Sequence, residues 1–247
     1  MSERSDALSI QDLSVRRGGS IVVRSVSVEV PRGSLVALLG ANGAGKSSLL
    51  DAISGTLAST GSVNIDGHSV SSAGASIRAR RGLGYIQQGR TVFPDLTVEQ
   101  NLLVVAPQRE LRRAWTLFPE LETLRRRRAE LLSGGEQQML MIARAVLTEP
   151  RYLMIDELSL GLAPTIVHRL YPVIRQLVTD GMGVLLVEQF ADAALKHADV
   201  AYVLARGTVT FEGAPDQLRS DSSLLRRAYL GEANAAQEPP RTGKARS

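Results

Sequence analysis

The sequence predicts an α/β fold with a parallel-sheet core, an antiparallel β subdomain and an inserted α-helical subdomain. Three observations support this prediction. Apolar and polar residues alternate through much of residues 10–30, which is typical of antiparallel strands. Short continuous apolar runs such as Leu35–Leu39 have the length of strands that are buried on both faces. Between residues 94 and 147 the apolar spacing becomes that of helices.

The first elements follow from local patterns. Strands are expected at 10–15 and 22–30, because their apolar residues alternate with polar ones. Leu35–Leu39 is expected to be a buried strand that leads through a glycine-rich loop into a helix over Lys46–Ser54. The pair Asp66–Gly67 is typical of a β-hairpin turn.

The later elements are expected to alternate between helices and strands. Thr97 with Gln100 predicts a capping box that opens a helix, and Pro164 suits the first position of another. Two further helices are predicted over 109–118 and 136–147. Short apolar runs predict strands at 84–86, 152–155, 183–187 and 200–204.

One folded domain is expected over residues 6–231, with the helical insertion at about 94–147. Beyond Gly231 the sequence becomes polar and rich in Ala, Pro and Gln, which predicts a disordered tail over 232–247. The chain contains no cysteine, so disulfides and thiolate metal sites are excluded. No stretch approaches the roughly 18–20 apolar residues that a membrane-spanning helix needs. Any membrane role is therefore expected to depend on partners.

The formal net charge of +4 is mildly basic, and arginine runs such as 125–128 account for much of it. Such runs are typical of a nucleic-acid surface, or of solvated helix faces and surfaces near anionic lipid. Aromatic residues make up only 4% of the chain, which gives little support to a base-stacking platform. We therefore expect no nucleic-acid partner.

A glycine-rich segment between the predicted buried strand and helix matches the phosphate-binding pattern G-x-x-x-x-G-K-[ST]. Its glycines let backbone N–H groups point at phosphate oxygens, and the helix N-terminus adds its dipole. Lys46 supplies a positive charge to the β and γ phosphates, and the Ser47 hydroxyl can bind Mg²⁺. The predicted nucleotide-binding residues of this segment are Gly40, Ala41, Asn42, Gly43, Ala44, Gly45, Lys46, Ser47 and Ser48. They predict a P-loop NTPase with a RecA-like core.

Two carboxylates, Asp156 and Glu157, end the predicted strand at 152–155. Ligands of doubly wound sheets bind at the carboxyl ends of the strands. Asp156 is therefore expected to hold Mg²⁺, and Glu157 to polarise the attacking water as a general base. Acidic residues often follow strands, and the pair gains its meaning from the phosphate-binding segment.

Residues 132–137 read L-S-G-G-E-Q and precede a helix expected to begin near Glu136. Small side chains leave that helix N-terminus open as a second anion site. This segment resembles the LSGGQ-type signature of ABC ATPases. The resemblance implies ATP and Mg²⁺ as cofactors, and a head-to-tail dimer in which the signature of one subunit caps the ATP bound to another. It assigns ATP contacts to Ser133, Gly134, Gly135 and Gln137.

The resemblance also implies roles for two glutamines. Gln88 takes the position of the Q-loop residue, which contacts Mg²⁺ and relays the nucleotide state to the helical subdomain. Gln189 takes the catalytic switch position, where most ABC ATPases have histidine. Residues 159–161 correspond to the D-loop, which lines the dimer interface. With these roles, Glu157, Lys46 and Gln189 are the predicted catalytic residues.

Besides Gln189, three positions depart from the family pattern. Arg17 stands where an aromatic residue usually stacks on adenine, so weaker or less selective base recognition is expected. Leu158 and Gln87 replace prolines beside the catalytic glutamate and the Q-loop glutamine. Both replacements call the rigidity of their loops into question, and neither removes a catalytic group.

Residues 8–231 are most similar to the ATPases of branched-chain amino-acid importers, the LivF-like branch, in which V-E-Q commonly stands at 187–189. The resemblance implies a second ABC ATPase subunit, as a hetero- or homodimer, membrane permeases and, indirectly, a solute-binding protein. It places the chain in the cytoplasm, on the inner face of the cell membrane. Urea, short-amide and lipid-related cargoes stay open, because no ATPase residue contacts cargo.

Two other functions are compatible with these motifs. One is a soluble ABC ATPase that acts on nucleic acid or ribosomes, although such proteins usually carry two ATPase domains in one chain. The other is a regulatory subunit that binds nucleotide without hydrolysing it. The presence of Lys46, Asp156 and Glu157 argues against the second alternative, while Arg17 and Gln189 keep it open.

Overall fold

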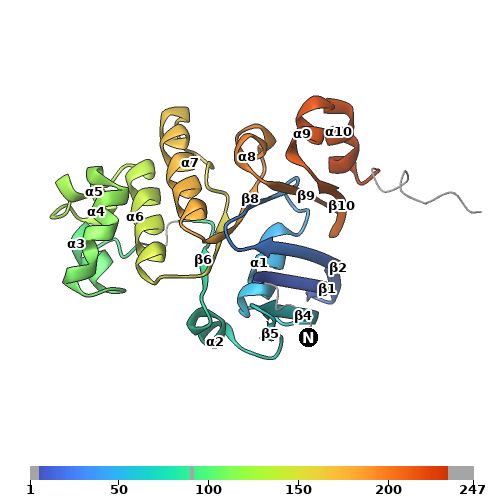
Figure 1. Cartoon of the computed structure of the whole chain (residues 1–247), viewed down its shortest axis with the longest axis horizontal. Coiled ribbons are helices and arrows are strands. Elements are labelled where there is room, and N and C mark those ends of the chain that lie inside the picture. The colour runs from blue at the N-terminus through green and yellow to red at the C-terminus, as the bar shows by residue number, and fades with distance from the viewer. Residues whose placement is uncertain (1–5, 90–91, 233–247) are drawn as a thin grey trace, which may run out of the picture.

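The alternating N-terminal segment forms an antiparallel sheet in the computed structural model, which describes residues 6–89 and 92–232 (Figure 1). Valines on one face of its strands are buried, and Ile10 pairs with Val28 across the first two strands. The order along this sheet is β2-β1-β4-β5. The strands are β1 (Ala7–Arg17), β2 (Ser20–Pro31), β4 (Ser59–Ile65) and β5 (His68–Ser69).

A second sheet has the order β10-β9-β3-β8-β7-β6 and forms the centre of the core. Its strands are parallel except β10, which pairs antiparallel with β9. Leu39 packs on the helical face and Leu38 on the face toward the antiparallel sheet, so this sheet separates two apolar cores. The strands are β3 (Leu35–Leu39), β6 (Leu83–Ile86), β7 (Tyr152–Asp156), β8 (Gly183–Glu188), β9 (Val200–Ala205) and β10 (Thr208–Gly213).

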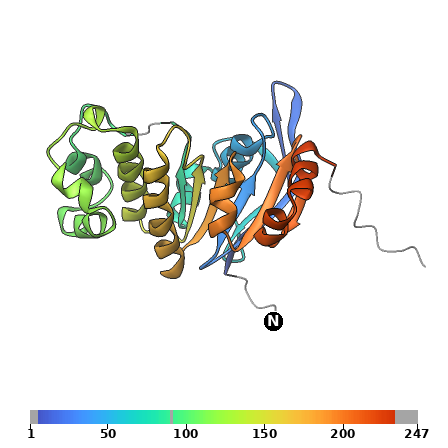
Figure 2. The same cartoon turned by 90° about the horizontal axis from the view of Figure 1, so that it is seen from above.

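Helices cover the parallel sheet and extend the molecule at both ends. Figures 1 and 2 place α3 to α6 at one end and α9 and α10 at the other. The helices of the core are α1 (Lys46–Ser54), α2 (Ala75–Arg80), α7 (Pro164–Thr179), α8 (Ala191–His197), α9 (Pro215–Ser220) and α10 (Ser222–Leu230). Those of the helical subdomain are α3 (Val98–Leu103), α4 (Leu111–Leu117), α5 (Pro119–Thr123) and α6 (Gly134–Leu147), with 3₁₀ turns at Gln108–Glu110 and Ala129–Leu131.

Most predicted elements are confirmed, including β3, α1, the Thr97 capping box and Pro164 as the first residue of α7. The helix predicted over 109–118 instead begins as the 3₁₀ turn Gln108–Glu110 and continues as α4, which ends at Leu117. Pro119 separates α4 from α5, because a residue before proline avoids the helical region, and Phe118 has φ −136° and ψ 79°.

Helix α6 begins at Gly134, two residues before the predicted start, because Ser133 is its N-cap. The predicted tail over 232–247 lies outside the described residues except for Glu232. Among residues 6–89 and 92–232, no helix has the length and apolarity required to cross a membrane.

Candidate functional site

The phosphate-binding segment lies between β3 and α1 and depends on its glycines. Gly43 and Gly45 have φ values of 80° and 107°, in the left-handed region that disfavours other residues. A Cβ on Gly45 would lie 2.7 Å from the Val22 carbonyl oxygen, and a Cβ on Gly40 would lie 2.4 Å from that of Leu204. Both contacts are with backbone, so neither could be relieved by a side-chain movement.

Lys46 is only 5% exposed, although it carries a positive charge. Its ammonium group donates hydrogen bonds to the carbonyl oxygens of Gly40 at 2.8 Å and Ala41 at 3.1 Å. Burial lowers the pKa of Lys46, and the charges of Glu157 and Asp156 act in the opposite direction. The lysine therefore folds back over the phosphate-binding segment, with carboxylates of two strand ends nearby.

Asp156, the last residue of β7, is 3% exposed and faces the start of α1. Burial raises the pKa of Asp156, and a hydrogen bond from the Ser47 side chain opposes that rise. Its Oδ1 atom is buried without a hydrogen-bond partner. A buried carboxylate oxygen without a partner, beside a hydroxyl, is a suitable oxygen donor set for Mg²⁺. These two predicted ligands therefore fit the metal.

Gln88 follows β6 and Glu157 follows β7, and these neighbouring parallel strands bring the two side chains together. The Gln88 amide nitrogen donates a hydrogen bond of 2.5 Å to the Glu157 carboxylate. Glu157 has a positive φ of 55°, which is rare for a residue with a side chain. Its backbone N–H donates to the Val187 carbonyl on β8 at 2.9 Å, which ties this conformation to the sheet.

Gln189 follows β8 and lies two residues before α8 begins at Ala191. Its side chain is half-buried, so it is not simply a solvent-facing residue. The Tyr229 hydroxyl on α10 donates a hydrogen bond of 3.1 Å to the Gln189 carbonyl oxygen. The C-terminal helix thus contacts the segment that carries the predicted switch residue.

The signature segment forms the N-terminus of α6. Ser133 and Glu136 form a capping box, in which each side chain accepts a hydrogen bond from the other residue's backbone N–H. Gln137 is 3% exposed, and its amide donates to the Ala129 carbonyl at 2.8 Å, which places it inside the helical subdomain. Within the described ranges, no hydrogen bond or ion pair joins Ser133, Gly134 or Gly135 to the phosphate-binding segment.

Arg17, predicted to lie near the adenine base of ATP, forms an ion pair of 2.5 Å with Asp51. Asp51 lies on α1, the helix that Lys46 begins, and it also accepts a hydrogen bond of 3.4 Å from the Tyr85 hydroxyl. The Arg17 side chain is 52% exposed, so its guanidinium remains open to solvent. Asp51 was not predicted, since a polar residue inside an amphipathic helix gives no distinct signal.

Leu158, which replaces a proline of the family pattern, is completely buried in the helical-face core. The next residue, Ser159, donates two hydrogen bonds to Glu188, a buried carboxylate at the end of β8. The loop after Glu157 is therefore anchored by packing and hydrogen bonds. Sequence reasoning missed Glu188, although a carboxylate that ends a continuous apolar run was a usable signal.

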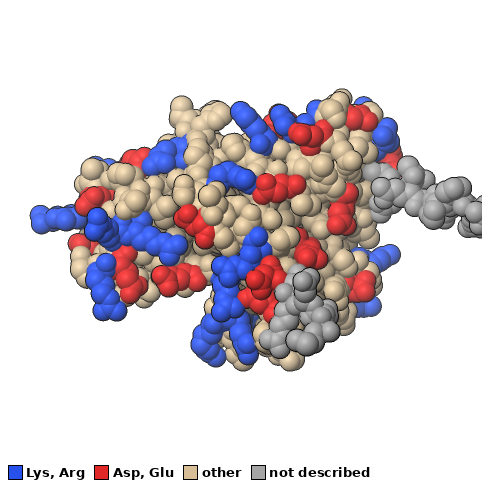
Figure 3. Space-filling model, viewed as in Figure 1, with Lys and Arg blue, Asp and Glu red and all other residues tan. Residues whose placement is uncertain are grey.

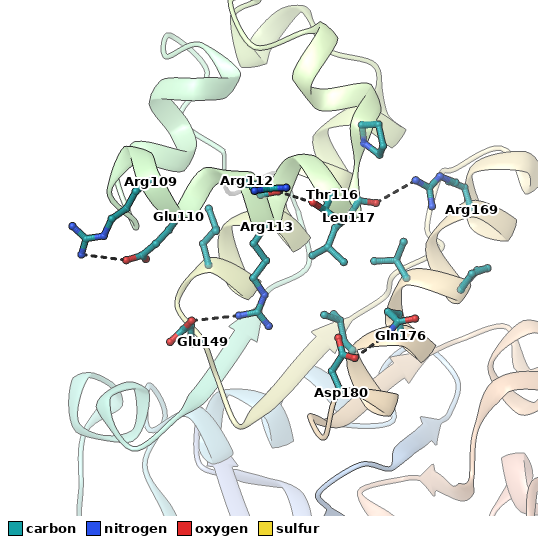
Figure 4. A pocket seen from close by; sticks show the side chains of 15 residues that line it. Arg109, Glu110, Arg112, Arg113, Thr116, Leu117, Glu149, Arg169, Gln176 and Asp180 are labelled. Atoms are coloured by element: carbon teal, nitrogen blue, oxygen red, sulfur yellow. Dashed lines mark hydrogen bonds and ion pairs between the residues drawn. The ribbon is translucent and has the colours of Figure 1, made fainter.

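A cavity of about 860 Å³ lies between α4 and α7 (Figure 4). Leu117, Leu147 and Leu177 contribute apolar lining, and Arg113 pairs with Glu149 at 3.5 Å on one side. None of the predicted nucleotide, metal or catalytic residues lines this cavity.

A glycine-rich segment, a buried lysine and two carboxylates at the end of a parallel strand together define a P-loop nucleoside triphosphatase. The family model described as "ABC transporter" matches residues 23–159, more than half of the chain. The chain therefore belongs to the ABC transporter family, as an ATP-binding, ATP-hydrolysing transporter subunit.

Several relatives match over most of their length. The high-affinity branched-chain amino acid transport ATP-binding protein BraG of Pseudomonas aeruginosa is 40% identical over 91% of this chain and 99% of its own. The lipopolysaccharide export system ATP-binding protein LptB of Escherichia coli is 34% identical over 91% and 97%. A probable branched-chain amino acid transport ATP-binding protein, LivF of Archaeoglobus fulgidus, is 35% identical over 80% and 87%.

Solved structures of ABC ATP-binding subunits have the same fold. One, described as the ATP-binding subunit of an ABC transporter, aligns with a TM-score of 0.78 and 30% identity, covering 91% of this chain and 98% of that one. The ATP-binding cassette MJ1267 in its ADP conformation aligns with a TM-score of 0.82 and 25% identity, covering 92% and 99%. The predicted fold class is confirmed.

Proposed function

We propose that the chain powers an importer of branched-chain amino acids or related small solutes such as urea or amides. The main support is the relative BraG, which matches at 40% identity across 99% of its length. The related export protein LptB is less similar, at 34% identity. In this proposal the chain lies on the inner face of the cell membrane, held there by permease subunits.

We assign the chemistry to the residues at the carboxyl ends of the parallel strands. The 40–48 segment and Lys46 bind the ATP phosphates through backbone N–H groups and a buried positive charge. Ser47, Asp156 and Gln88 are the proposed Mg²⁺ ligands, and Mg²⁺ bound there would neutralise phosphate charge. Glu157 acts as the general base that takes a proton from the attacking water.

The hydrogen bond from Gln88 to Glu157 supports a positioning role for the glutamine. An amide has both a donor and an acceptor, so its nitrogen can hold Glu157 while its oxygen meets the cation. Gln189 cannot carry the charge of the usual histidine, and it is proposed to orient the γ-phosphate by hydrogen bonding alone. Arg17 is proposed to lie beside the adenine base of ATP.

The composite arrangement of the site supports a dimer. Ser133, Gly134 and Gly135 lie at a separate helix N-terminus, a kind of position that favours anions, on the helical subdomain rather than beside Lys46. We propose that they cap the ATP of a partner ATPase, which is either a related subunit or a second copy. Gln137 would then support this helix N-terminus from inside the subdomain.

A groove between the core and the helical subdomain is the proposed permease contact. A cavity of about 340 Å³ there is lined by residues that include Tyr85, Val105 and Met141. Arg144 also lines it, and its guanidinium lies 4.7 Å from the ring centroid of Phe93, which is 44% exposed. An apolar groove with an exposed aromatic suits an amphipathic permease helix. The sequence predicts that Gln88 and Arg90 lie near this groove, and Arg90 lies outside the described residues.

The nucleic-acid alternative receives little support from the surface. On the face shown in Figure 3, basic side chains gather in groups that acidic side chains border, which is not the one-sign surface typical of nucleic-acid binding. The alternative of a regulatory subunit that binds nucleotide without hydrolysing it is less consistent with the site, because Lys46, Asp156 and Glu157 lie close together there.

Purification of the tagged chain from gently solubilised native membranes tests the proposal, with partners identified by mass spectrometry. We expect polytopic permeases, a sister ATPase and a solute-binding protein, whose ligand would name the cargo. Recovery of ribosomal or DNA-repair proteins without any membrane subunit would contradict the importer and favour the soluble alternative. Recovery of permeases from an export system would support a role in transport but contradict the proposal of import.

A further inference from the structure

Glu188, the last residue of β8, is a carboxylate that is only 1% exposed. One of its oxygens accepts the backbone N–H of Ser159 at 3.0 Å, and the other accepts the Ser159 hydroxyl at 2.9 Å. Ser159 lies two residues after Glu157, and Glu188 directly precedes Gln189. One side chain thus links the segments that carry the proposed base and switch residues.

We propose that Glu188 is a positioning residue for ATP hydrolysis, whose two hydrogen bonds to Ser159 hold Glu157 and Gln189 in fixed relation. This inference rests on the roles assigned to Glu157 and Gln189 under Proposed function. Glu188 contacts neither the attacking water nor the phosphates in this assignment, and it acts through the loop after Glu157.

The backbone conformation of Glu157 explains why such a contact is needed. A glutamate at a φ of 55° is strained, and it persists only where its surroundings hold it. Three successive residues supply that support. Glu157 donates its N–H to the Val187 carbonyl, Leu158 is completely buried, and Ser159 is held by Glu188. Loss of the contact between Ser159 and Glu188 would therefore weaken the support for Glu157, the proposed general base.

The surroundings of Glu188 make the contact sensitive to protonation. Its charge interacts electrostatically with groups from four segments. These are Lys46 on α1, Glu157 in the loop after β7, Tyr171 on α7 and Tyr229 on α10. Burial raises the pKa of Glu188 to about 7, and the Ser159 hydrogen bonds oppose the rise. An ionised carboxylate accepts both Ser159 donors, whereas a protonated one turns one oxygen into a donor.

Steady-state ATP hydrolysis by Glu188→Gln, Ser159→Ala and the double variant of the full chain tests the inference. Glu122→Gln, which changes an exposed carboxylate in the helical subdomain, is the matched control. We expect kcat to fall about 10- to 100-fold in Glu188→Gln with KM for ATP nearly unchanged, as for loss of a charged hydrogen bond. Because the two residues act through one contact, the double variant should lose less than the product of the single losses.

The pH profile of kcat separates positioning from a merely structural role. Below its pKa Glu188 is protonated and the contact weakens, so wild-type kcat should rise through a step near pH 7. Ser159→Ala removes a hydrogen bond that lowers the pKa of Glu188, so the step should move to higher pH. Glu188→Gln should abolish the step, whereas Glu122→Gln should retain it.

Wild-type kcat in both single variants, or fully multiplicative losses with an unchanged pH profile, would overturn the inference. Thermal unfolding of each variant identifies misfolding, and Ser159→Ala carries the test if Glu188→Gln does not fold. Glu157→Gln distinguishes failure of the proposed site from failure of the positioning role of Glu188. If Glu157→Gln hydrolyses ATP normally, the proposed site fails. If it is inactive while the Glu188 and Ser159 variants behave as wild type, only the positioning role fails.

Discussion

The amide nitrogen of Gln88 lies 2.5 Å from a carboxylate oxygen of Glu157, although the two residues are 69 positions apart in the chain. This hydrogen bond joins the segment that leads into the helical subdomain to the proposed general base. Gln88 follows β6 and precedes that subdomain, so the contact places the proposed base beside the segment through which the subdomain joins the core. We expect a partner bound to the helical subdomain to affect hydrolysis through this contact.

Replacement of Glu157 by glutamine keeps the size of the side chain and removes its capacity to take a proton. Hydrolysis should fall about 10²- to 10⁴-fold, the usual contribution of a general base. ATP binding should persist, so the variant should accumulate as a nucleotide-bound dimer. Single-turnover hydrolysis and size-exclusion chromatography with ATP measure both effects, with Glu122→Gln as the control. Full turnover by Glu157→Gln would remove this residue from the base role.

Replacement of Lys46 by alanine should abolish the charged contact with the phosphates. Loss of charge-assisted hydrogen bonds predicts about 10- to 100-fold weaker ATP binding. Lys46→Met is the better packed variant, since Lys46 is 5% exposed and a truncation would leave a gap. Equilibrium titration with ATP measures the effect, and Lys196→Ala, on the exposed part of α8, controls for charge. Unchanged affinity in both Lys46 variants would contradict the assignment of the phosphate-binding segment.

The ion pair between Arg17 and Asp51 predicts a small contribution of Arg17 to ATP affinity. The guanidinium is half exposed and already held at 2.5 Å from Asp51, so stacking on adenine would add only about 0.5–1 kcal/mol. Arg17→Ala should therefore weaken ATP binding about fivefold at most, whereas Arg17→Tyr should strengthen it. A tenfold or larger loss in Arg17→Ala would mean that Arg17 contacts the phosphates.

Elements with strong local signals could be predicted from the sequence. Strand β3 and helix α1 have the bounds expected from an apolar run and a glycine-rich segment. The Thr97 capping box was predicted because its two partners are three residues apart. Helices α8 to α10 were not predicted, because each has nine residues or fewer and shows little apolar periodicity.

The contacts that organise the candidate site could not be predicted, because their partners are distant in the chain. Ser159 and Glu188 are 29 residues apart, and Arg17 and Asp51 are 34 apart. The motifs identified which residues lie at the ends of the strands. Which of these residues contact one another depends on the order of the parallel strands in the sheet. The replacement of a proline by Leu158 predicts a less rigid loop after Glu157, but burial of the leucine side chain anchors this loop.

Gly135 in the signature segment packs against Ile166 on α7, and this contact predicts the effect of adding one methyl group. A Cβ at Gly135 would lie 2.8 Å from the Cγ2 atom of Ile166, closer than carbon atoms can approach. Gly135→Ala should therefore push the N-terminus of α6 away from α7. We expect a loss of about 1–3 kcal/mol in stability, as for other overpacked sites, together with reduced ATP turnover.

A second substitution identifies the contact as the cause. Ile166→Ala removes all three side-chain atoms nearest to the added Cβ, so Gly135→Ala should be nearly neutral in an Ile166→Ala background. Gly74→Ala, whose added Cβ would have no atom within 4 Å, controls for the loss of a glycine. Thermal unfolding of the four variants measures the coupling. Equal destabilisation by Gly135→Ala in both backgrounds would show that the methyl group acts elsewhere, for instance on the anion-binding capacity of the helix N-terminus.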